Sequence, residues 1–141
     1  MIIRSVKAII LKKKKYLLQL RDNKKNIFFP NYWGLFGGRL NKGEKYENCI
    51  RREIKEEINL NIRIVKKIVS VNYSMIGLTK DRDLNYYECS TKDFSNIRLF
   101  EGKKFKFFSF NELKSLKIIP MDYVAINAHF NYKYLPDNKT R

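Results

Sequence analysis

Apolar and polar positions alternate in the first part of the chain with the period of a β-strand. The segments from Ile2 to Leu11 and from Tyr16 to Leu20 are rich in β-branched and other apolar residues. Segments of this kind predict strands. The lysine run from Lys12 to Lys15 separates them and is expected to be a solvated hairpin turn. Trp33 to Phe36 predicts a further short strand, after which Gly37-Gly38 is expected to open a loop.

A helical period replaces the alternation in the middle of the chain. Tyr46 to Ile58 carries Tyr46, Ile50, Ile54 and Ile58 four residues apart, which predicts a helix with one apolar stripe. Near the other end, Ser109 and Glu112 fit a capping box for a short helix that ends near Leu116. Pro120 is suited to the first turn of a last helix, expected to run to about Phe130.

Strands are also expected between these helices, from Ile62 to Met75, from Arg82 to Cys89 and from Lys104 to Phe110. The order of strands, helix, strands and helices is typical of an α/β protein with a mixed β-sheet sandwiched between helices. The expected organisation is one domain over residues 1–134, followed by a basic C-terminal tail over 135–141.

Length and composition agree with a single globular domain. The chain has 141 residues, of which 44% are hydrophobic, enough to bury a core. Cys49 and Cys89 belong to no metal-binding pattern and are too few for a disulfide framework, so both are interpreted as reduced thiols. No signal peptide or membrane-spanning run is present. A cytoplasmic protein without a membrane partner is therefore expected.

The formal net charge of +16 leaves two interpretations open. A basic protein attracts polyphosphates or nucleic acids, but a composition rich in lysine, isoleucine and asparagine can also reflect a biased genome. The lysines are scattered, and no motif of a nucleic-acid-binding module accompanies them. Specific nucleic-acid binding is therefore not expected.

The most informative segment is GRLNKGEKYENCIRREIKEEINL, from Gly38 to Leu60. On the predicted helix, Glu53, Glu56 and Glu57 project from one side. Clustered carboxylates repel one another, and their hard oxygens suit Mg²⁺ or Mn²⁺. A solvated acidic face with ordinary salt bridges is the alternative. The upstream glycines and Glu44 at fixed distances favour the metal site.

The spacing G-x5-E-x7-R-E-U-x-E-E, in which U is Ile54, resembles the signature box of the Nudix hydrolases. Two further segments, Tyr16 to Gly38 with its W-x-L-x-G-G ending and Phe100 to Leu113, are similar to other parts of that family. The resemblance implies an α/β/α fold. It also implies Mg²⁺-dependent cleavage of a nucleoside diphosphate linked to another group.

The resemblance also implies roles for individual residues. The Gly37 carbonyl, Glu53, Glu56 and Glu57 would ligate the metal. Glu53 is the first choice of general base and Glu101, from a loop, is the alternative, while Glu44 would support the base or a metal-bound water. Arg52 is spaced to pair with Glu56 and so orient the acidic group.

Substrate contacts are expected around the two glycines. Gly37 and Gly38 lack a Cβ, so the backbone can pass close to a metal and a phosphate. Arg39 could bind a phosphate in bidentate fashion, with an ordinary surface position as the alternative. Trp33 is a candidate for stacking on a nucleobase, as are Tyr32, Phe28, Phe29, Tyr73, Tyr86 and Tyr87. His129, the single histidine, is expected to be structural or on the surface.

One position departs from the family. Asn59 stands where the family has a glycine after the glutamates. This position ends the predicted helix, where a left-handed residue is usual and asparagine is the best substitute for glycine. We expect a modest cost in stability and no loss of activity.

The substrate class follows partly from exclusions. No proline lies between Pro30 and Pro120, whereas ADP-ribose hydrolases of the family tend to carry one after the box. The lead-in typical of coenzyme A hydrolases is also missing. Nucleoside triphosphates, including oxidised ones such as 8-oxo-dGTP, are favoured. Nucleotide sugars, or a non-catalytic module that binds a nucleotide or RNA, are the alternatives. Dimers are common in the family, so a homodimer is an open alternative.

Overall fold

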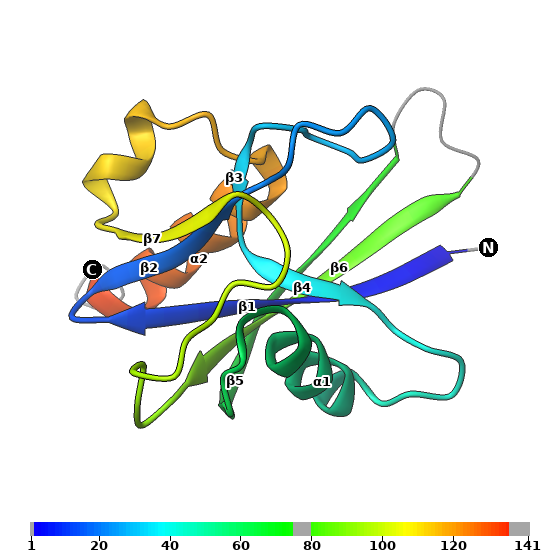
Figure 1. Ribbon diagram of the computed structural model, residues 1–141, viewed down its shortest axis with the longest axis horizontal. Coiled ribbons are helices and arrows are strands. Elements are labelled where there is room, and N and C mark those ends of the chain that lie inside the picture. The colour runs from blue at the N-terminus through cyan, green and yellow to red at the C-terminus, as the bar shows by residue number, and fades with distance from the viewer. Residues whose placement is uncertain (1, 75–79, 136–141) are drawn as a thin grey trace.

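The computed structural model describes residues 2–74 and 80–135. Seven strands, two α-helices and a short 3₁₀-helix make up the fold (Figure 1). The strands are β1 (Ile2–Lys12), β2 (Lys15–Leu20), β3 (Trp33–Gly34), β4 (Phe36–Arg39), β5 (Arg63–Tyr73), β6 (Asp81–Ser90) and β7 (Lys104–Phe108). The helices are α1 (Tyr46–Ile58), η1 (Asn111–Ser115) and α2 (Pro120–Tyr134).

The strands form a mixed sheet organised around β1. Strands β3, β2, β1, β6 and β5 follow one another in this order, while β4 also pairs with β1 and β7 with β2. The β1–β6 pair is parallel, with Ile3 beside Arg82 and Ser5 beside Leu84. The pairs of β1 with β4 and of β5 with β6 are antiparallel. A mixed sheet is confirmed.

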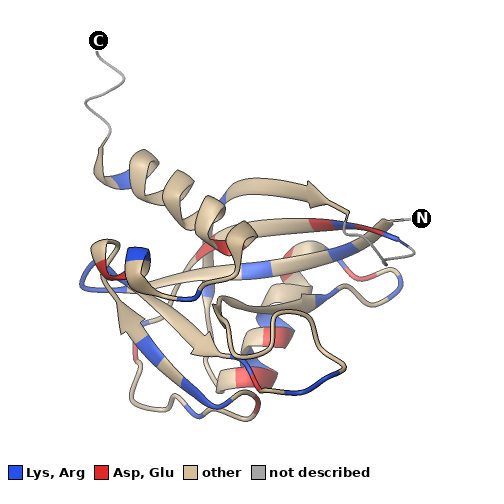
Figure 2. Ribbon diagram, turned by 90° about the horizontal axis from the view of Figure 1, so that it is seen from above, with Lys and Arg blue, Asp and Glu red and all other residues tan. Residues whose placement is uncertain are grey.

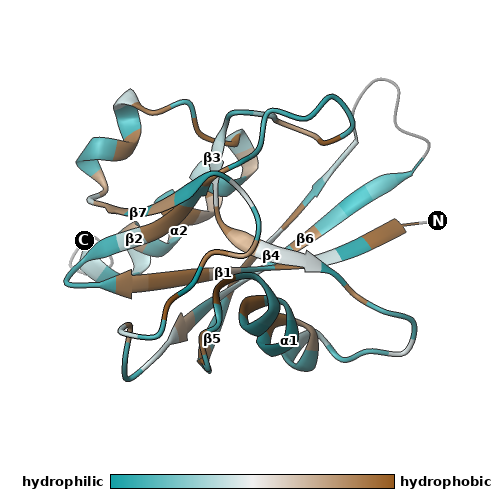
Figure 3. Ribbon diagram, in the orientation of Figure 1, coloured by the Kyte–Doolittle hydropathy of each residue, from teal (hydrophilic) through white to brown (hydrophobic). Residues whose placement is uncertain are grey.

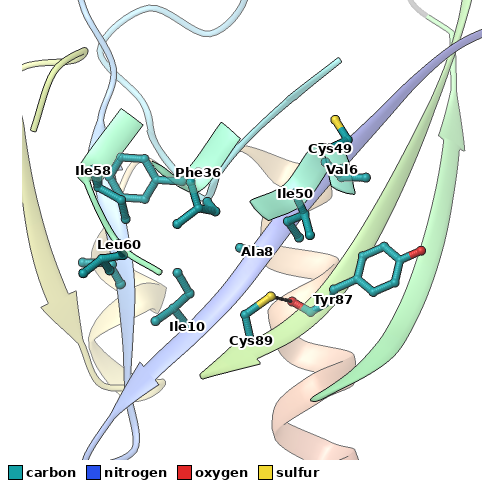
Figure 4. Packing of buried hydrophobic residues seen from close by; sticks show 12 residues of the cluster. Val6, Ala8, Ile10, Phe36, Cys49, Ile50, Ile58, Leu60, Tyr87 and Cys89 are labelled. Atoms are coloured by element: carbon teal, nitrogen blue, oxygen red, sulfur yellow. Dashed lines mark hydrogen bonds between the residues drawn. The ribbon is translucent and has the colours of Figure 1, made fainter. Parts of the chain in front are cut away.

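The two α-helices cover opposite faces of this sheet. Successive apolar side chains of β1 point alternately to one face and to the other, so each helix has an apolar surface to pack against. Val6, Ala8 and Ile10 pack with the apolar side of α1 in one core cluster (Figure 4). Ile9, between them in sequence, belongs to a second cluster with Ala125 and Ile126 of α2. Successive side chains of a strand point to opposite faces, so alternation along one strand produces both cores. Figure 3 shows the corresponding apolar and polar sides of α1.

Local sequence signals placed several elements correctly. The predicted lysine turn joins β1 to β2, with positive φ at Lys13 and Lys14, as the twist of a tight hairpin requires. Helix α1 has the predicted bounds. It ends at Asn59, whose φ of 58° lies in the left-handed region. Ser109 and Glu112 form the predicted capping box before η1, through two reciprocal hydrogen bonds.

Two predictions around the glycines were wrong. The expected strand from Trp33 to Phe36 is divided into β3, which pairs with β2, and β4, which pairs with β1. Gly37-Gly38 does not open a loop but lies within β4, opposite Lys7 and Val6. A Cβ on Gly37 would collide with the Val6 carbonyl. The glycines therefore permit a close strand pair rather than a turn.

The remaining boundaries differ by a few residues. α2 continues to Tyr134, beyond the expected end near Phe130, and β7 ends at Phe108 rather than Phe110. Met75 and residues 136–141, which include most of the predicted tail, lie outside the described residues. Basic positions are spread over most elements, and acidic positions lie on α1 and on several other elements (Figure 2). In the described ranges, no helix is long and apolar enough to span a membrane.

Candidate active site

The acidic side of α1 meets the edge of the sheet at β4. The Gly37 backbone N–H donates a hydrogen bond of 2.9 Å to Glu57 Oε1. A Cβ on Gly38 would collide with the carboxyl group of Glu53. The glycine pair therefore allows two carboxylates of α1 to lie directly against the strand, which any larger residue at Gly38 would prevent.

Arg52 connects the carboxylates on the outer side of α1. Its Nε and Nη2 donate to the two oxygens of Glu44, both at 2.8 Å. Its Nη1 donates to Glu53 Oε1 at 2.9 Å, and lies 3.4 Å from both oxygens of Glu56. The predicted pairing of Arg52 with Glu56 is therefore present. The shorter contacts are with Glu44 and Glu53, so Arg52 links the start of the helix to the middle.

Glu44 is held firmly as a charged group. Besides its bidentate contact with Arg52, Glu44 Oε1 accepts a hydrogen bond of 2.9 Å from the Asn41 N–H. The hydrogen bond from Arg52, followed by the one from Asn41, lowers the pKa of Glu44 to about 2. Glu44 is thus linked to Glu53 through Arg52. In this arrangement Glu44 can hold Arg52 in place, and Arg52 can position Glu53.

The inner carboxylates have the opposite electrostatics. Glu57 is 9% exposed, and burial, followed by repulsion from Glu53, raises its pKa to about 8. Burial also raises the pKa of Glu53, against the influence of Arg52. Within the part of the chain that the structure describes, Glu57 forms no ion pair. A cation from outside the chain would stabilise the ionised form of this buried carboxyl group.

The glutamates do not form a complete metal cage by themselves. In the described ranges, no three His, Cys, Asp or Glu side chains come close enough together to hold a metal ion. Arg52 contacts Glu53 and Glu56, whereas Glu57 faces the Gly37 N–H. The donors nevertheless fit a hard divalent cation, because they are carboxylate oxygens around a buried glutamate that forms no ion pair with another described residue. The predicted ligation by Gly37, Glu53, Glu56 and Glu57 stays a prediction.

A cavity of about 370 Å³ adjoins the glycines, a volume within the range of small-molecule sites. Its polar lining includes Lys7, Gln19, Arg21, Arg39 and Arg82, and its apolar lining includes Ile3, Phe28, Phe29, Leu84, Ile119 and Met121. A second cavity of about 410 Å³ contains Glu57 and Glu101. Gln19, Arg21 and Ile27 line both cavities. Glu57 and Glu101 therefore line a cavity that shares part of its wall with the more basic first cavity.

The other predicted site residues are placed differently from one another. Glu101 lies on the loop before β7 and lines the second cavity together with Glu57; its predicted role as a fourth carboxylate stays a prediction. Gly38 and Arg39 line the first cavity. Trp33, by contrast, packs edge-on against Phe108 with ring centroids 4.8 Å apart. Its predicted contact with substrate stays a prediction.

The aromatic candidates divide into core and cavity. Tyr86 and Tyr87 are buried in the two core clusters. Phe28, Phe29 and Tyr73 line the first cavity. The choice between these two groups needed the tertiary structure, because both are aromatic residues within apolar segments.

Several cavity residues were not identified from the sequence. Lys7 and Gln19 are polar residues inside strands that otherwise read as apolar, which is a signal that could have pointed to them. Lys7 Nζ lies 3.1 Å from Asp122 Oδ2, a buried carboxylate that also accepts hydrogen bonds from the Leu35 N–H and the Tyr86 hydroxyl. This network connects the first turn of α2 to the cavity wall.

The chain is similar in sequence to known proteins. A family model described as the NUDIX domain matches residues 1–130. The oxidized purine nucleoside triphosphate hydrolase of Danio rerio is 34% identical over 64 residues, which cover 45% of this chain and 41% of that protein. The protein of the same name from Mus musculus is 27% identical over 80 residues, covering 57% and 49%. The chain spans less than half the length of either relative in these matches.

The fold has close structural counterparts. A MutT NUDIX hydrolase from Burkholderia pseudomallei superimposes with a TM-score of 0.80 over 91% of this chain and 98% of that chain. The sequences are 19% identical, so this similarity shows the fold alone.

Proposed function

The chain belongs to the Nudix hydrolase family, and from this premise we propose that it hydrolyses nucleoside triphosphates to nucleoside monophosphates. Canonical and oxidised deoxynucleotides, such as 8-oxo-dGTP, are the expected substrates. Water attacks a phosphorus of the triphosphate chain, and the bond between that phosphorus and a bridging oxygen breaks. The products are the monophosphate and pyrophosphate.

The observation that carries the proposal is the pairing of Glu57 and Glu53 with the glycine strand at the edge of a basic cavity. Glu57 is buried without an ion pair among the described residues, beside Gly37 at 2.9 Å. Lys7, Arg21 and Arg39 line the adjoining cavity. Excess negative charge at one point and positive charge around it suit a metal-bound polyphosphate.

Mg²⁺ is the expected cofactor and Mn²⁺ an acceptable substitute, with the Gly37 carbonyl, Glu53, Glu56 and Glu57 as ligands. When bound, the metal neutralises phosphate oxygens and lowers the pKa of the attacking water. The absence of a Cβ at Gly38 keeps the backbone close to the carboxylates, so that a phosphate can approach them.

Glu53 is proposed as the general base that takes the proton from the attacking water. The 2.9 Å contact with Arg52 Nη1 orients its carboxylate, and Glu44 in turn holds the guanidinium with two hydrogen bonds. A base must be held in position to contribute its usual 10²- to 10⁴-fold, roughly, to a rate. Glu101 is the alternative base, because it lines the cavity that contains Glu57.

Substrate positioning is assigned to the basic lining. Arg39 can bind phosphate oxygens at the end near the glycines, since a guanidinium matches a phosphate in bidentate fashion. The names of the Danio rerio and Mus musculus relatives support a purine nucleoside triphosphate as substrate.

The direct test is to incubate the protein with Mg²⁺ and a panel of substrates. The panel contains nucleoside triphosphates, 8-oxo-dGTP, nucleotide sugars and dinucleotide polyphosphates. Monophosphate release is followed for the natural chain and for Glu57→Gln, which keeps the shape of the side chain. We expect turnover of triphosphates, lowered roughly a hundredfold or more by Glu57→Gln because a metal ligand is lost.

Glu47→Gln is the matched control, because Glu47 lies on the same helix with its side chain 61% exposed and pairs only with Arg51 among the described residues. It should leave turnover unchanged. Turnover of nucleotide sugars alone would replace the proposed substrate class. If the folded protein releases no monophosphate from any substrate of the panel, the proposed hydrolase activity is rejected and a non-catalytic binding module is favoured.

A further inference from the structure

Arg82 occupies a distinct place at the far side of the first cavity. It lies on β6, directly beside Ile3 of β1 and Tyr73 of β5. Direct strand neighbours share a face of the sheet, and all three residues line the cavity. Arg82 is thus two strands away from β4 and its glycines, which corresponds to roughly 10 Å across the sheet.

The guanidinium of Arg82 is not fully satisfied. Among the residues that the structure describes, its Nη1 is shielded from solvent and has no hydrogen-bond partner. A buried donor without an acceptor is rare and costs free energy. No other side-chain nitrogen or oxygen in the described ranges is in this condition. The donor is therefore available to a group from outside the chain.

Phe28 forms the cover over this guanidinium. The Arg82 Cζ lies 5.6 Å from the centroid of the Phe28 ring, within the range of a cation–π contact. The loop is held in place because Arg21 Nε donates a hydrogen bond of 3.0 Å to the Phe28 carbonyl oxygen. The Phe28 residue is nevertheless 45% exposed, so its ring has room on the solvent side to move aside.

The surroundings favour a nucleobase over a phosphate as the missing partner. Apolar side chains of Ile3, Leu84 and Met121 line the same cavity, which suits a flat heterocycle better than a charged phosphate. The phosphates are already assigned to the opposite end, near Gly38 and Arg39. A nucleotide with its phosphates at the glycines would extend its base toward Arg82.

We propose that Arg82 determines base specificity by donating from Nη1 to the carbonyl oxygen at position 6 of a purine. This inference rests on the proposed nucleotide hydrolysis and names its substrate as a 6-oxopurine nucleoside triphosphate, such as dGTP or 8-oxo-dGTP. In DNA recognition, arginine or lysine bound to guanine O6 and N7 is the commonest specific side-chain contact with a base. An adenine presents an amino group at this position, which would face the guanidinium donor to donor.

The experiment compares kcat/KM for dGTP and dATP in the natural chain and in Arg82→Met, which keeps the length of the side chain and removes the donor. We expect the preference for dGTP over dATP to fall by roughly ten- to hundredfold, as loss of a charged hydrogen bond implies. 8-oxo-dGTP shares the carbonyl and should lose activity like dGTP.

Arg63→Met is the matched control. Arg63 lies on β5 at the opposite end of that strand, beside Ser90, and does not line the first cavity. It removes the same charge and should leave the ratio between dGTP and dATP unchanged. Phe28→Leu provides a second contrast, because weaker stacking should lower kcat/KM for all bases alike.

An unchanged ratio in Arg82→Met, with turnover intact in the natural chain, overturns the inference and leaves the proposed function standing. If Arg82→Met lowers kcat/KM for dTTP relative to dCTP and leaves the ratio between dGTP and dATP unchanged, the assignment to purines is overturned. If no nucleotide is hydrolysed, the proposed function fails, and the dissociation constants of GMP and AMP then test the role of Arg82. The inference is overturned if the natural chain and Arg82→Met each bind GMP and AMP equally, or if neither nucleotide binds.

Discussion

Two buried glutamates on opposite sides of the sheet have almost the same exposure and opposite electrostatics. Glu57 is 9% exposed and Glu88 is 6% exposed. Burial raises the pKa of Glu57 to about 8. Burial acts on Glu88 in the same direction, but hydrogen bonds from Lys133 and His129 outweigh it, and its pKa lies below the ordinary value.

The partners explain the difference. Glu88 Oε2 accepts from Lys133 Nζ at 2.7 Å, and its Oε1 lies 2.8 Å from His129 Nε2. Because an ionised carboxylate can only accept, His129 carries its proton on Nε2, and Nδ1 accepts from the Tyr16 hydroxyl at 2.8 Å. We call these four residues the α2 network. It is neutralised by the chain itself, whereas Glu57 forms no ion pair with any residue in the described ranges.

This contrast separates a structural polar cluster from a candidate functional one. A carboxylate whose lone pairs and charge are all matched within the chain stabilises the fold and has no capacity for a ligand. A buried carboxylate beside other carboxylates needs a cation from outside. The prediction that His129 is structural or on the surface agrees with its buried position in the α2 network.

The largest expected effect is a difference in stability between variants of Glu88 and variants of Glu57. Glu88→Ala leaves Lys133 and His129 without their partner, and should lower the free energy of unfolding by roughly 3 kcal/mol. Glu57→Gln should cost far less, because a pKa of about 8 keeps the buried Glu57 carboxyl mostly neutral at pH 7 and the amide is neutral as well. Urea denaturation followed by circular dichroism measures both. Equal losses in the two variants would show that the proposed distinction between the clusters is wrong.

A smaller effect concerns the positioning of Glu53. Arg52→Lys keeps the charge but cannot make two parallel hydrogen bonds to Glu44, so we expect kcat to fall roughly tenfold with KM nearly unchanged. The pH profile of kcat should shift as well, since the Arg52 contact lowers the pKa of Glu53. Arg51→Lys, on the exposed side of α1, is the control. An unshifted profile would leave Arg52 with a structural role only.

The smallest expected effect is a pH dependence of stability from the α2 network. Burial lowers the pKa of His129 below 6.5, although Glu88 acts against the shift. The unfolded chain then binds the proton more readily, so stability is complete above pH 6.5 and falls as the pH drops below it. Protonation of Glu88 causes a further loss at lower pH.

This dependence is best measured as the melting temperature between pH 8 and pH 5 in the Glu57→Gln background, which removes the carboxyl group whose pKa of about 8 would titrate in that range. The loss should be smaller than that caused by Glu88→Ala. His129→Gln is the control, because the chain has a single histidine. A melting temperature that falls equally in both proteins would exclude His129 as the cause.

The sequence by itself determined the elements whose signals are local. The apolar stripe from Tyr46 to Ile58 predicted α1 with its bounds, and Asn59 was correctly expected in the left-handed conformation. The spacing of Glu53, Glu56 and Glu57 placed them on one side of this helix. Helical periodicity, capping and turn preferences act over a few neighbouring residues, so the sequence alone contains them.

Only the tertiary structure decided which distant residues meet. Gly37 and Gly38 read as a loop until pairing with β1 placed them in a strand against Glu53 and Glu57. The same holds for Arg82, which contacts the ring of Phe28 although 53 residues separate the two in the chain. Strand register and the closure of the cavity depend on contacts between segments far apart in the chain. No local pattern specifies them, because pairing and burial are properties of the assembled sheet.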